Sequence, residues 1–454
     1  MEILNLLGTI VKMGAVLAVM LGLIHMLGRK AVWRKALGIA LAFGVVQLAI
    51  TLHFGDFQLF GDFDQGLLFQ AVTMAMVALG LNLIYGFNGQ FSLAQWGFYG
   101  IGAYCAADIT FRWTNGDPRG LLVVGLGTIL AGLAILGVRR AVGRIRGIPV
   151  LSAFTLYLLA TVAAAAAAVV LGGLLAPSLA PLLGTASAPG LLNGALPRQA
   201  VFFLSVVFAG VFAAEVSFLF GLPVLTLGSD YFGIATLGFA MVVKTLMVNS
   251  DTILPFPEMK GGRGMIGIPH FTTWAWAFFF LLASIVIMRN LVHSSTGRAV
   301  LSVREDETAA RVMGINVADS KLLAFVVGSF MAGLGGGVYA HYIGFLSPGT
   351  FDFIAGFNPL IIVVFGGLGS MTGTVVASFG WIFFLEGFLR VLLGQLGTDA
   401  PTWRFVLYPI TLLLLMLLKP EGLFGTKELG FLKAPRIVRR AAAEAAAPAG
   451  RKEE

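Results

Sequence analysis

The chain has 454 residues, of which 58% are hydrophobic and only 11% are charged. Soluble domains carry about 25% charged residues, so this composition excludes a soluble globular protein and places most of the chain in lipid. The formal net charge is +8. The basic residues lie in short loops and in the C-terminal tail, which is typical of membrane topology and not of nucleic-acid binding. The single cysteine, Cys105, excludes an internal disulfide framework.

Apolar runs long enough to cross a bilayer recur along the chain, since a span needs about 20 residues. We therefore predict an all-α, polytopic transmembrane helical bundle of about 11–13 spans, with some helices broken or re-entrant. The excess of Lys and Arg in alternate loops places the N-terminus outside and the C-terminus in the cytoplasm. The candidate spans are 4–27, 36–54, 66–87, 91–111, 120–138, 150–175, 200–222, 231–248, 271–289, 322–345, 355–369, 371–394 and 404–418.

Polar amides and glycines interrupt the apolar run at 81–104. Unpaired amides are costly in hydrocarbon, so these side chains are expected to face protein or water. We predict an unwound segment that lines a transport path; the alternative is a tight turn whose amides form interhelical hydrogen bonds. A second Gly-interrupted run lies at 357–375, and such a pair marks either broken helices beside a path or ordinary Gly-mediated packing. The candidate path residues are Asn82, Asn88, Gln90, Ser92 and Gln95.

A charged stretch at 297–316 separates two apolar runs. Ser302, followed three residues later by Glu305, fits a capping box, and Gly314 fits a left-handed helix end. The pattern predicts a helix of about three turns over 302–316, which is too short to cross a membrane. A solvated loop helix and a helix that docks on a partner both fit this pattern.

The same stretch supplies the side chains that we expect at such a docking surface. Acidic side chains in the first turn are favoured by the helix dipole, and small alanine side chains allow a partner to approach closely. The candidate docking residues are Ser302, Arg304, Glu305, Asp306, Glu307, Ala309, Ala310 and Gly314.

Several ionisable residues lie within or beside apolar runs. Asp230 is expected to cap the helix that follows it. Lys244 lies well inside a candidate span, so we expect it to snorkel, to pair with an acid or to face a cavity. Glu386 and Arg390 are four residues apart, which favours an ion pair on one helix face. Glu215 has no sequence-local partner and is left unassigned. The five scattered histidines lack ligand spacing, so no metal site is expected.

Motifs for catalysis are missing from the sequence. It holds no G-x-x-x-x-G-K-[ST], no G-x-S-x-G and no H-E-x-x-H. The chain therefore carries no P-loop for ATP, no catalytic residue is assigned, and an enzyme function is not supported. A secondary transporter driven by an ion gradient, with Glu215 and Glu386 as its candidate acids, and a non-transporting membrane scaffold or enzyme stay open as alternatives to a permease driven by partner subunits.

Three stretches resemble the branched-chain amino acid ABC transporter permeases, specifically the M-type subunit family. They are LNLIYGFNGQFSLAQWGFYGIGAY at 81–104, GSDYFGIATLGF at 228–239 with GGRGMIGIP at 261–269, and GRAVLSVREDETAARVMGINV from 297 onward, followed by KLLAFVVGSFMAGLGGGVYAHYIGFLSP and VVFGGLGSMTGTVVA. The similarity covers about 66–111 and 200–425. Because several motifs occur in the same order, the resemblance is specific.

The resemblance implies a permease subunit of an ABC importer in the bacterial inner membrane, which moves branched-chain amino acids, or related small amides such as urea, inward. The implied partners are a second permease subunit, two nucleotide-binding ATPase subunits that bind ATP and Mg, an external solute-binding protein and membrane lipid. The chain itself would hold no cofactor and no nucleic acid. The segment 302–316 would be the coupling helix, with Glu307–Gly314 at the position of the family's EAA…G loop.

The resemblance also divides the chain into expected parts. They are extra N-terminal spans (1–65), a permease domain (66–433) with inserted spans and a Pro-, Gly- and Ser-rich linker (112–199, linker 176–199), a cytoplasmic coupling loop (290–321) and a disordered cytoplasmic tail (434–454). The family often has a His-containing step where this chain has Ala94-Gln95-Trp96. The substrate is therefore not fixed by the resemblance.

Overall fold

The computed structural model describes residues 32–51, 60–144, 149–186, 190–225, 229–252, 259–389, 421–425 and 427–429, with isolated positions in 8–22, 53–58, 403–419 and 432. The candidate spans 4–27 and 404–418 lie mainly outside the described residues, and the tail 434–454 lies wholly outside them. Arg390 is also outside, so the expected pair with Glu386 stays a prediction.

Helices make up nearly all of the described chain, which confirms the all-α, polytopic prediction. In chain order they are α2 (Val32–Thr51), α3 (Asp62–Leu81), η1 (Asn82–Phe87), α4 (Gln95–Thr114), α5 (Arg119–Arg144), α6 (Val150–Leu183), α7 (Ala195–Val224), α8 (Ser229–Val248), η3 (Gly261–Arg263), α9 (Trp274–Val292), α10 (Ser295–Glu305), α11 (Glu307–Val312), α12 (Val317–Ile343), η4 (Pro348–Phe351), α13 (Phe357–Gly366), α14 (Met371–Ile382) and η5 (Phe383–Leu389).

Seven of the described helices are long and apolar enough to cross a membrane, from Asp62–Phe87 to Val317–Ile343. The candidate span 355–369 corresponds to α13, which has only 10 residues. At 1.5 Å per residue such a helix covers about half of the hydrocarbon thickness. The short length of α13 agrees with the expectation of broken or re-entrant helices.

The centre of the bundle is built from α3, α4, α7 and α12, and close helix crossings occur there at glycines. A Cβ added to Gly80 of α3 would lie 2.3 Å from the carbonyl oxygen of Gly328 in α12. A Cβ added to Gly102 of α4 would lie 2.2 Å from the carbonyl oxygen of Gly333. Only glycine permits these approaches, so Gly-mediated packing holds the core together.

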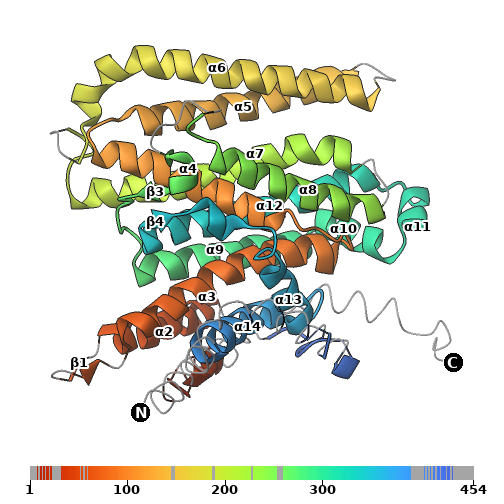
Figure 1. Ribbon diagram of the computed structural model, residues 1–454. Coiled ribbons are helices and arrows are strands. Elements are labelled where there is room, and N and C mark those ends of the chain that lie inside the picture. Colours follow the sequence, from red (N-terminus) through yellow and green to blue (C-terminus); the bar gives the residue numbers. More distant parts are fainter. Residues whose placement is uncertain are drawn as a thin grey trace.

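Helices α5 and α6 form an outer layer at one edge of the bundle (Figure 1). Their apolar faces are mostly exposed, as expected for lipid-facing spans. The predicted linker at 176–199 is too long, because α6 continues through Pro177 and Pro181 to Leu183. Two prolines four residues apart each remove one backbone hydrogen bond on the same helix face, and the rest of the helix persists.

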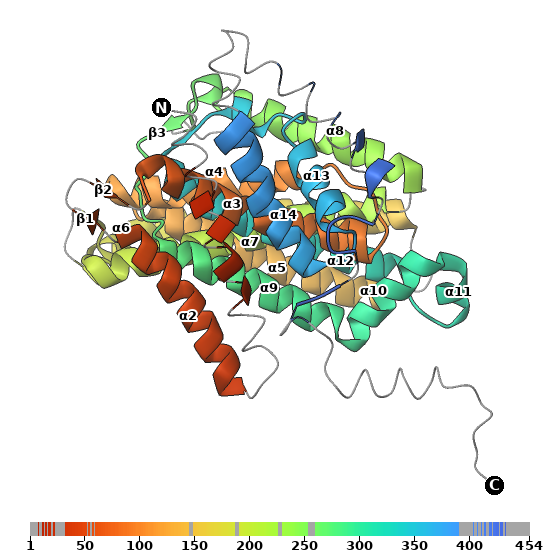
Figure 2. The same cartoon turned by 90° about the horizontal axis from the view of Figure 1, so that it is seen from below.

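The two ends of the bundle differ in kind. Helices α10 and α11 project at one end, at the right of Figure 1, and Figure 2 shows them at the same end from below. The opposite end carries two short antiparallel pairs, β1 (His53–Phe54) with β2 (Phe57–Gln58) and β3 (Met265–Ile266) with β4 (Phe345–Leu346). In the second pair, Met265 lies opposite Leu346 and Ile266 opposite Phe345.

Candidate functional site

The two Gly-interrupted runs lie together in the fold. Helix α3 passes directly into the π-helical segment η1 and ends at Asn88, and a turn at 367–370 separates α13 from α14. A Cβ on Gly86 in η1 would lie 2.6 Å from the backbone nitrogen of Gly369 in that turn. We call η1 and the turn 367–370 the broken-helix junction.

Asn82 joins the two halves of the broken-helix junction. Its Nδ2 donates to the carbonyl oxygen of Ser370 at 2.9 Å and to Oγ1 of Thr374 at 2.7 Å. Its Oδ1 accepts from the backbone N–H of Gly369 at 2.9 Å. Asn82 is fully buried, and both its amide nitrogen and its amide oxygen are hydrogen-bonded to protein. These are the contacts of an interhelical bridge, and a role in the transport path stays a prediction.

The other candidate path residues are also buried, but their amides are not all paired. Asn88 donates through Nδ2 to Oε1 of Gln90 at 2.8 Å, and Ser92 Oγ accepts from the backbone N–H of Ala94 at 3.3 Å. Among the described residues, Oδ1 of Asn88 and both polar atoms of Gln95 have no hydrogen-bond partner. A buried unpaired amide costs about 1–3 kcal/mol, so a polar ligand or water is expected beside Gln95.

Aromatic side chains with polar tips extend from Gln95 along α4. Trp96 donates through Nε1 to the carbonyl oxygen of Thr350 at 3.0 Å and stacks on Tyr99, with ring centroids 4.8 Å apart. Tyr99 and Tyr104 both contact Phe351, and the Tyr104 hydroxyl has no partner among the described residues. The sequence analysis did not single out Tyr104, although a tyrosine hydroxyl inside a span next to polar amides indicates a polar environment.

The predicted single helix over 302–316 is wrong, because the helix is interrupted at Asp306. Helix α10 begins after Ser294, whose Oγ accepts from the backbone N–H of Gly297 at 3.0 Å. Asp306 has an extended backbone, and its Oδ1 accepts from the N–H groups of Thr308 and Ala309 at 2.7 and 3.0 Å. An aspartate that satisfies two free N–H groups starts a second helix, α11.

The predicted capping box at Ser302 and Glu305 is therefore also wrong. Ser302 lies inside α10 and donates through Oγ to the carbonyl oxygen of Ala299 at 2.8 Å. Gly314 has φ +82°, which confirms the predicted left-handed residue after the last helical turn. We call α10 and α11 the charged hairpin.

A small apolar cluster and an ion pair fix the charged hairpin to α12. Val303, Ala310 and Val317 are buried against one another, and Lys321 pairs with Glu307. Ala310 is thus covered by its own chain, while Ala309 is exposed. Of the two alanines expected at a docking surface, only Ala309 is open to a partner.

The last residues of α11 carry large apolar side chains that the chain does not cover. Val312 is 81% exposed, and Met313, which follows it, is 80% exposed. Their chain neighbours Arg311 and Gly314 are exposed as well. An apolar pair on a charged element that projects from one end of the bundle is an unusual surface feature.

Lys244, expected to snorkel, pair or face a cavity, pairs with an acid. Its Nζ lies 2.9 Å from Oδ1 of Asp352, which follows η4.

Asp230 does not lie at the capping position that was expected for it. Helix α8 begins at Ser229, so Asp230 lies within the first turn, and its side chain is outside the described part. Glu215 lies beside α5, where a Cβ on Gly132 would be 3.3 Å from its Oε1.

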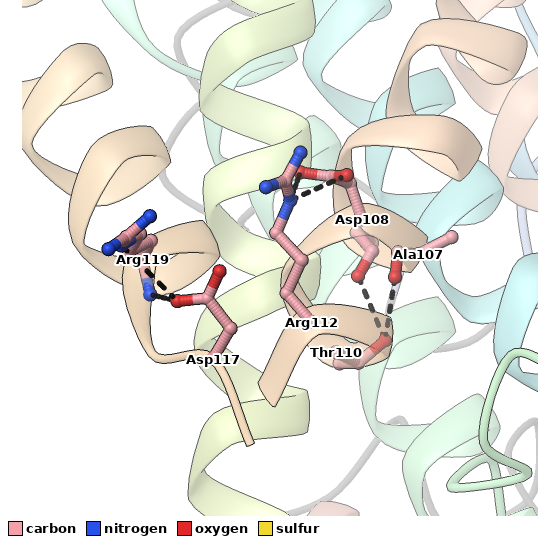
Figure 3. A network of polar contacts seen from close by, with 7 residues as sticks. Ala107, Asp108, Thr110, Arg112, Asp117 and Arg119 are labelled. Atoms are coloured by element: carbon pink, nitrogen blue, oxygen red, sulfur yellow. Dashed lines mark hydrogen bonds and ion pairs between the residues drawn. The ribbon is translucent and has the colours of Figure 1, made fainter. Parts of the chain in front are cut away.

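The sequence analysis did not predict a partly buried ion pair near the end of α4. Arg112 donates through Nε to Oδ1 of Asp108 at 3.0 Å, and Figure 3 shows this pair beside the contacts of Thr110 and Asp117. Asp117 accepts from the backbone N–H of Arg119 at 2.9 Å, at the start of α5. The i, i+4 spacing of Asp108 and Arg112 would have predicted the pair.

A cavity of about 660 Å³ lies at the end of the bundle opposite the charged hairpin. It is bounded by α2, α3, α9 and α12, and its lining includes Phe43, Gln47, Gln65, Phe69, Thr273 and Tyr342. Within the described ranges, no group of three or more His, Cys, Asp and Glu residues could hold a metal ion.

Comparison with known families shows to which protein family the chain belongs. The family model described as the branched-chain amino acid transport system permease component matches residues 141–417, more than half of the chain. The chain belongs to this permease family. The matched range holds the charged hairpin and the turn between α13 and α14, whereas η1 precedes it.

Relatives of the chain are named as permease proteins of the high-affinity branched-chain amino acid transport system. The high-affinity branched-chain amino acid transport system permease protein LivM of Escherichia coli (strain K12) is 30% identical over 251 residues, which are 49% of this chain and 57% of LivM. LivH of the same strain is 29% identical over 156 residues, 34% of this chain and 47% of LivH. BraD of Pseudomonas aeruginosa PAO1 is 26% identical over 182 residues, 39% of this chain and 55% of BraD.

The chain spans about half the length of the curated relatives it matches. No solved structure matches it.

Proposed function

We propose that this chain is the permease subunit of an ABC importer in the bacterial inner membrane, which moves branched-chain amino acids or related small amides inward. Membership in the permease family and the names of the relatives support the substrate class. In this proposal ATP and Mg are bound by two separate ATPase subunits, and the charged hairpin faces the cytoplasm, with the N-terminus outside and the C-terminus inside.

The exposed pair Val312 and Met313 is the observation that carries the proposal. Burying such a side chain at an interface contributes about 1.5–3 kcal/mol, whereas leaving it in water contributes nothing. Arg311, the chain neighbour of Val312, and Asp306, which starts α11, are charged and exposed on the same hairpin. An apolar centre within a charged rim is typical of a protein contact surface.

Gln95 and Tyr104 are the proposed contacts for the substrate in the path. Both lie on α4 and present buried polar atoms without a partner among the described residues. A zwitterionic amino acid or a small amide offers both donors and acceptors to such groups. The other proposed partners are a second permease subunit, for which the similarity to LivH gives support, and an external solute-binding protein.

The test is reconstitution of the chain with the ATPase, second permease and solute-binding subunits of the same transporter. We expect uptake of labelled leucine, isoleucine and valine into proteoliposomes only when ATP is present on the hairpin side. Val312→Asp with Met313→Asp should weaken retention of the ATPase subunits by about tenfold or more. The matched control is Ile266→Asp, at an exposed apolar residue of β3 at the opposite end.

Three outcomes would contradict the proposal. Uptake driven by an ion gradient without ATPase subunits would favour a secondary transporter. Absence of solute flux in the complete, ATP-hydrolysing complex would favour a scaffold. Equal ATPase retention by the Val312/Met313 variant and the Ile266 control would exclude the exposed tip as the docking surface.

A further inference from the structure

Arg304 lies where the charged hairpin meets the broken-helix junction. Its Nη1 donates to the backbone carbonyl oxygen of Gly86 in η1. Because α3 and η1 form one continuous helix that ends at Asn88, the last carbonyl oxygens of this helix carry the negative end of its dipole. A guanidinium group is the favourable charge at that position.

Two left-handed glycines make room for the Arg304 side chain. A Cβ on Gly89, which has φ +77°, would lie 3.4 Å from Cγ of Arg304. A Cβ on Gly369, which has φ +85°, would lie 3.0 Å from Nη1 of Arg304. Arg304 therefore reaches both the end of the first broken helix and the turn that interrupts the second.

Both partners in this contact are held firmly by other residues. The charged hairpin is fixed to α12 by the cluster around Val303 and by the pair of Lys321 with Glu307. The junction is fixed by Asn82, which bridges η1 and the turn 367–370. Arg304 is thus a side-chain contact between two parts of the molecule that are each held in place by other residues.

We propose that Arg304 is the positioning residue through which the charged hairpin moves the broken-helix junction, so that the hairpin, η1 and the turn 367–370 move as one body. The inference rests on the proposed function, since it takes the ATPase subunits to act on the hairpin. Helix α10 also packs on its neighbours through the buried Val300 and Val303. Removal of Arg304 should therefore lower coupling without preventing assembly.

The first experiment compares Arg304→Gln with Arg298→Gln in the complete reconstituted transporter. Arg298 lies on the same helix and is exposed, and it donates a long, 3.4 Å contact to the carbonyl oxygen of His293. We expect Arg304→Gln to keep its ATPase subunits and its ATP hydrolysis, while uptake per ATP falls about tenfold or more. Arg298→Gln should stay within about twofold of the wild type. Arg304→Lys should recover part of the loss, because an ammonium keeps the charge but not the planar donor geometry.

A second experiment replaces the Arg304 contact by a covalent bond. The Cβ position of Gly89 lies 3.6 Å from Cβ of Arg304, within the range of a disulfide. In a Cys105→Ser background, Gly89→Cys with Arg304→Cys should be uncoupled when reduced and should regain uptake per ATP when oxidised. This variant tests whether the contact at position 304 couples ATP hydrolysis to uptake, even if Arg304→Gln assembles poorly.

Two results would overturn the inference: equal uptake per ATP in Arg304→Gln and Arg298→Gln, or no gain on oxidation of the cysteine pair. A wild-type complex that binds its ATPase subunits and hydrolyses ATP without any uptake would overturn the proposed function, and this inference with it. The two failures are distinguishable because the first leaves wild-type transport intact.

Discussion

The side chain of Asn82 donates to the backbone carbonyl oxygen of Ser370 at 2.9 Å, although 288 positions separate the two residues. This bond, with those to Thr374 and from Gly369, joins the end of α3 to the start of α14. Both interrupted helices thus share one buried amide. Buried amides with complete partners specify a single arrangement of the helices that carry them.

Asn82→Ala should destabilise the protein by about 1–3 kcal/mol, because the part-buried N–H of Gly369 loses its acceptor and the bonds to Ser370 and Thr374 are lost with it. The measurement is thermal unfolding in detergent or nanodiscs. Asn290→Ala is the control, since Asn290 is exposed and accepts a long, 3.4 Å contact from Arg289; a change within about 0.5 kcal/mol is expected there. Equal unfolding temperatures for the two variants would contradict the bridge.

Gln95→Leu should raise or preserve stability while abolishing most uptake. The substitution removes two buried polar atoms that have no partner among the described residues, and sites kept for function are often not optimised for stability. The control is Gln199→Leu, which removes the acceptor of the Trp276 indole N–H and should lower stability without changing substrate specificity. A Gln95→Leu variant that transports normally would remove Gln95 from the path.

Burial raises the pKa of Glu428, although hydrogen bonds from Thr372 and from the backbone N–H of Met371 lower it. A carboxyl whose folded-state pKa is raised binds its proton more tightly in the folded protein. Its contribution to stability is therefore fully present below the unfolded pKa and is lost as pH rises through the folded pKa.

The stability of the wild type relative to Glu428→Gln should accordingly increase as pH is lowered from 8 to about 4. Thermal unfolding of both proteins across this range checks the sign. The matched control is Glu421→Gln, at an exposed glutamate close to Glu428 in the chain. A relative stability that falls with falling pH would show that the hydrogen bonds outweigh burial.

The two alanines of α11 should respond differently to enlargement. Ala310→Leu overfills the cluster with Val303 and Val317 and should cost about 1–3 kcal/mol, seen as a lower unfolding temperature. Ala309→Leu adds an exposed side chain and should leave stability within about 0.5 kcal/mol. On the proposed function, Ala309→Leu still weakens ATPase binding. The assignment fails if Ala310→Leu is the tolerated variant.

The sequence predicted well whatever depends on neighbours along the chain. Gly314, for example, ends its helix in the left-handed conformation. Lys244 does have an acid partner, one of its three expected states, but that partner is Asp352 in a distant segment, which the sequence did not indicate. The helix break at Asp306 was missed because Ser302 with Glu305 and Ser294 with Gly297 are equally acceptable starts in local terms. The choice between them depends on how Val300 and Val303 are buried against other helices.

The sequence by itself determined that this chain is a polytopic helical membrane protein, because lipid excludes charge and leaves backbone groups no partners outside a helix. The resemblance to the branched-chain permeases came from its motifs and not from this composition. Only the tertiary structure decided which amides are paired. Asn82 and Gln95 are both amides within apolar sequence. Residues almost 300 positions away satisfy the amide of Asn82, whereas the amide of Gln95 has no partner in the part of the chain that the structure describes. Those contacts, like that of Arg304 with Gly86, form only when the helices pack.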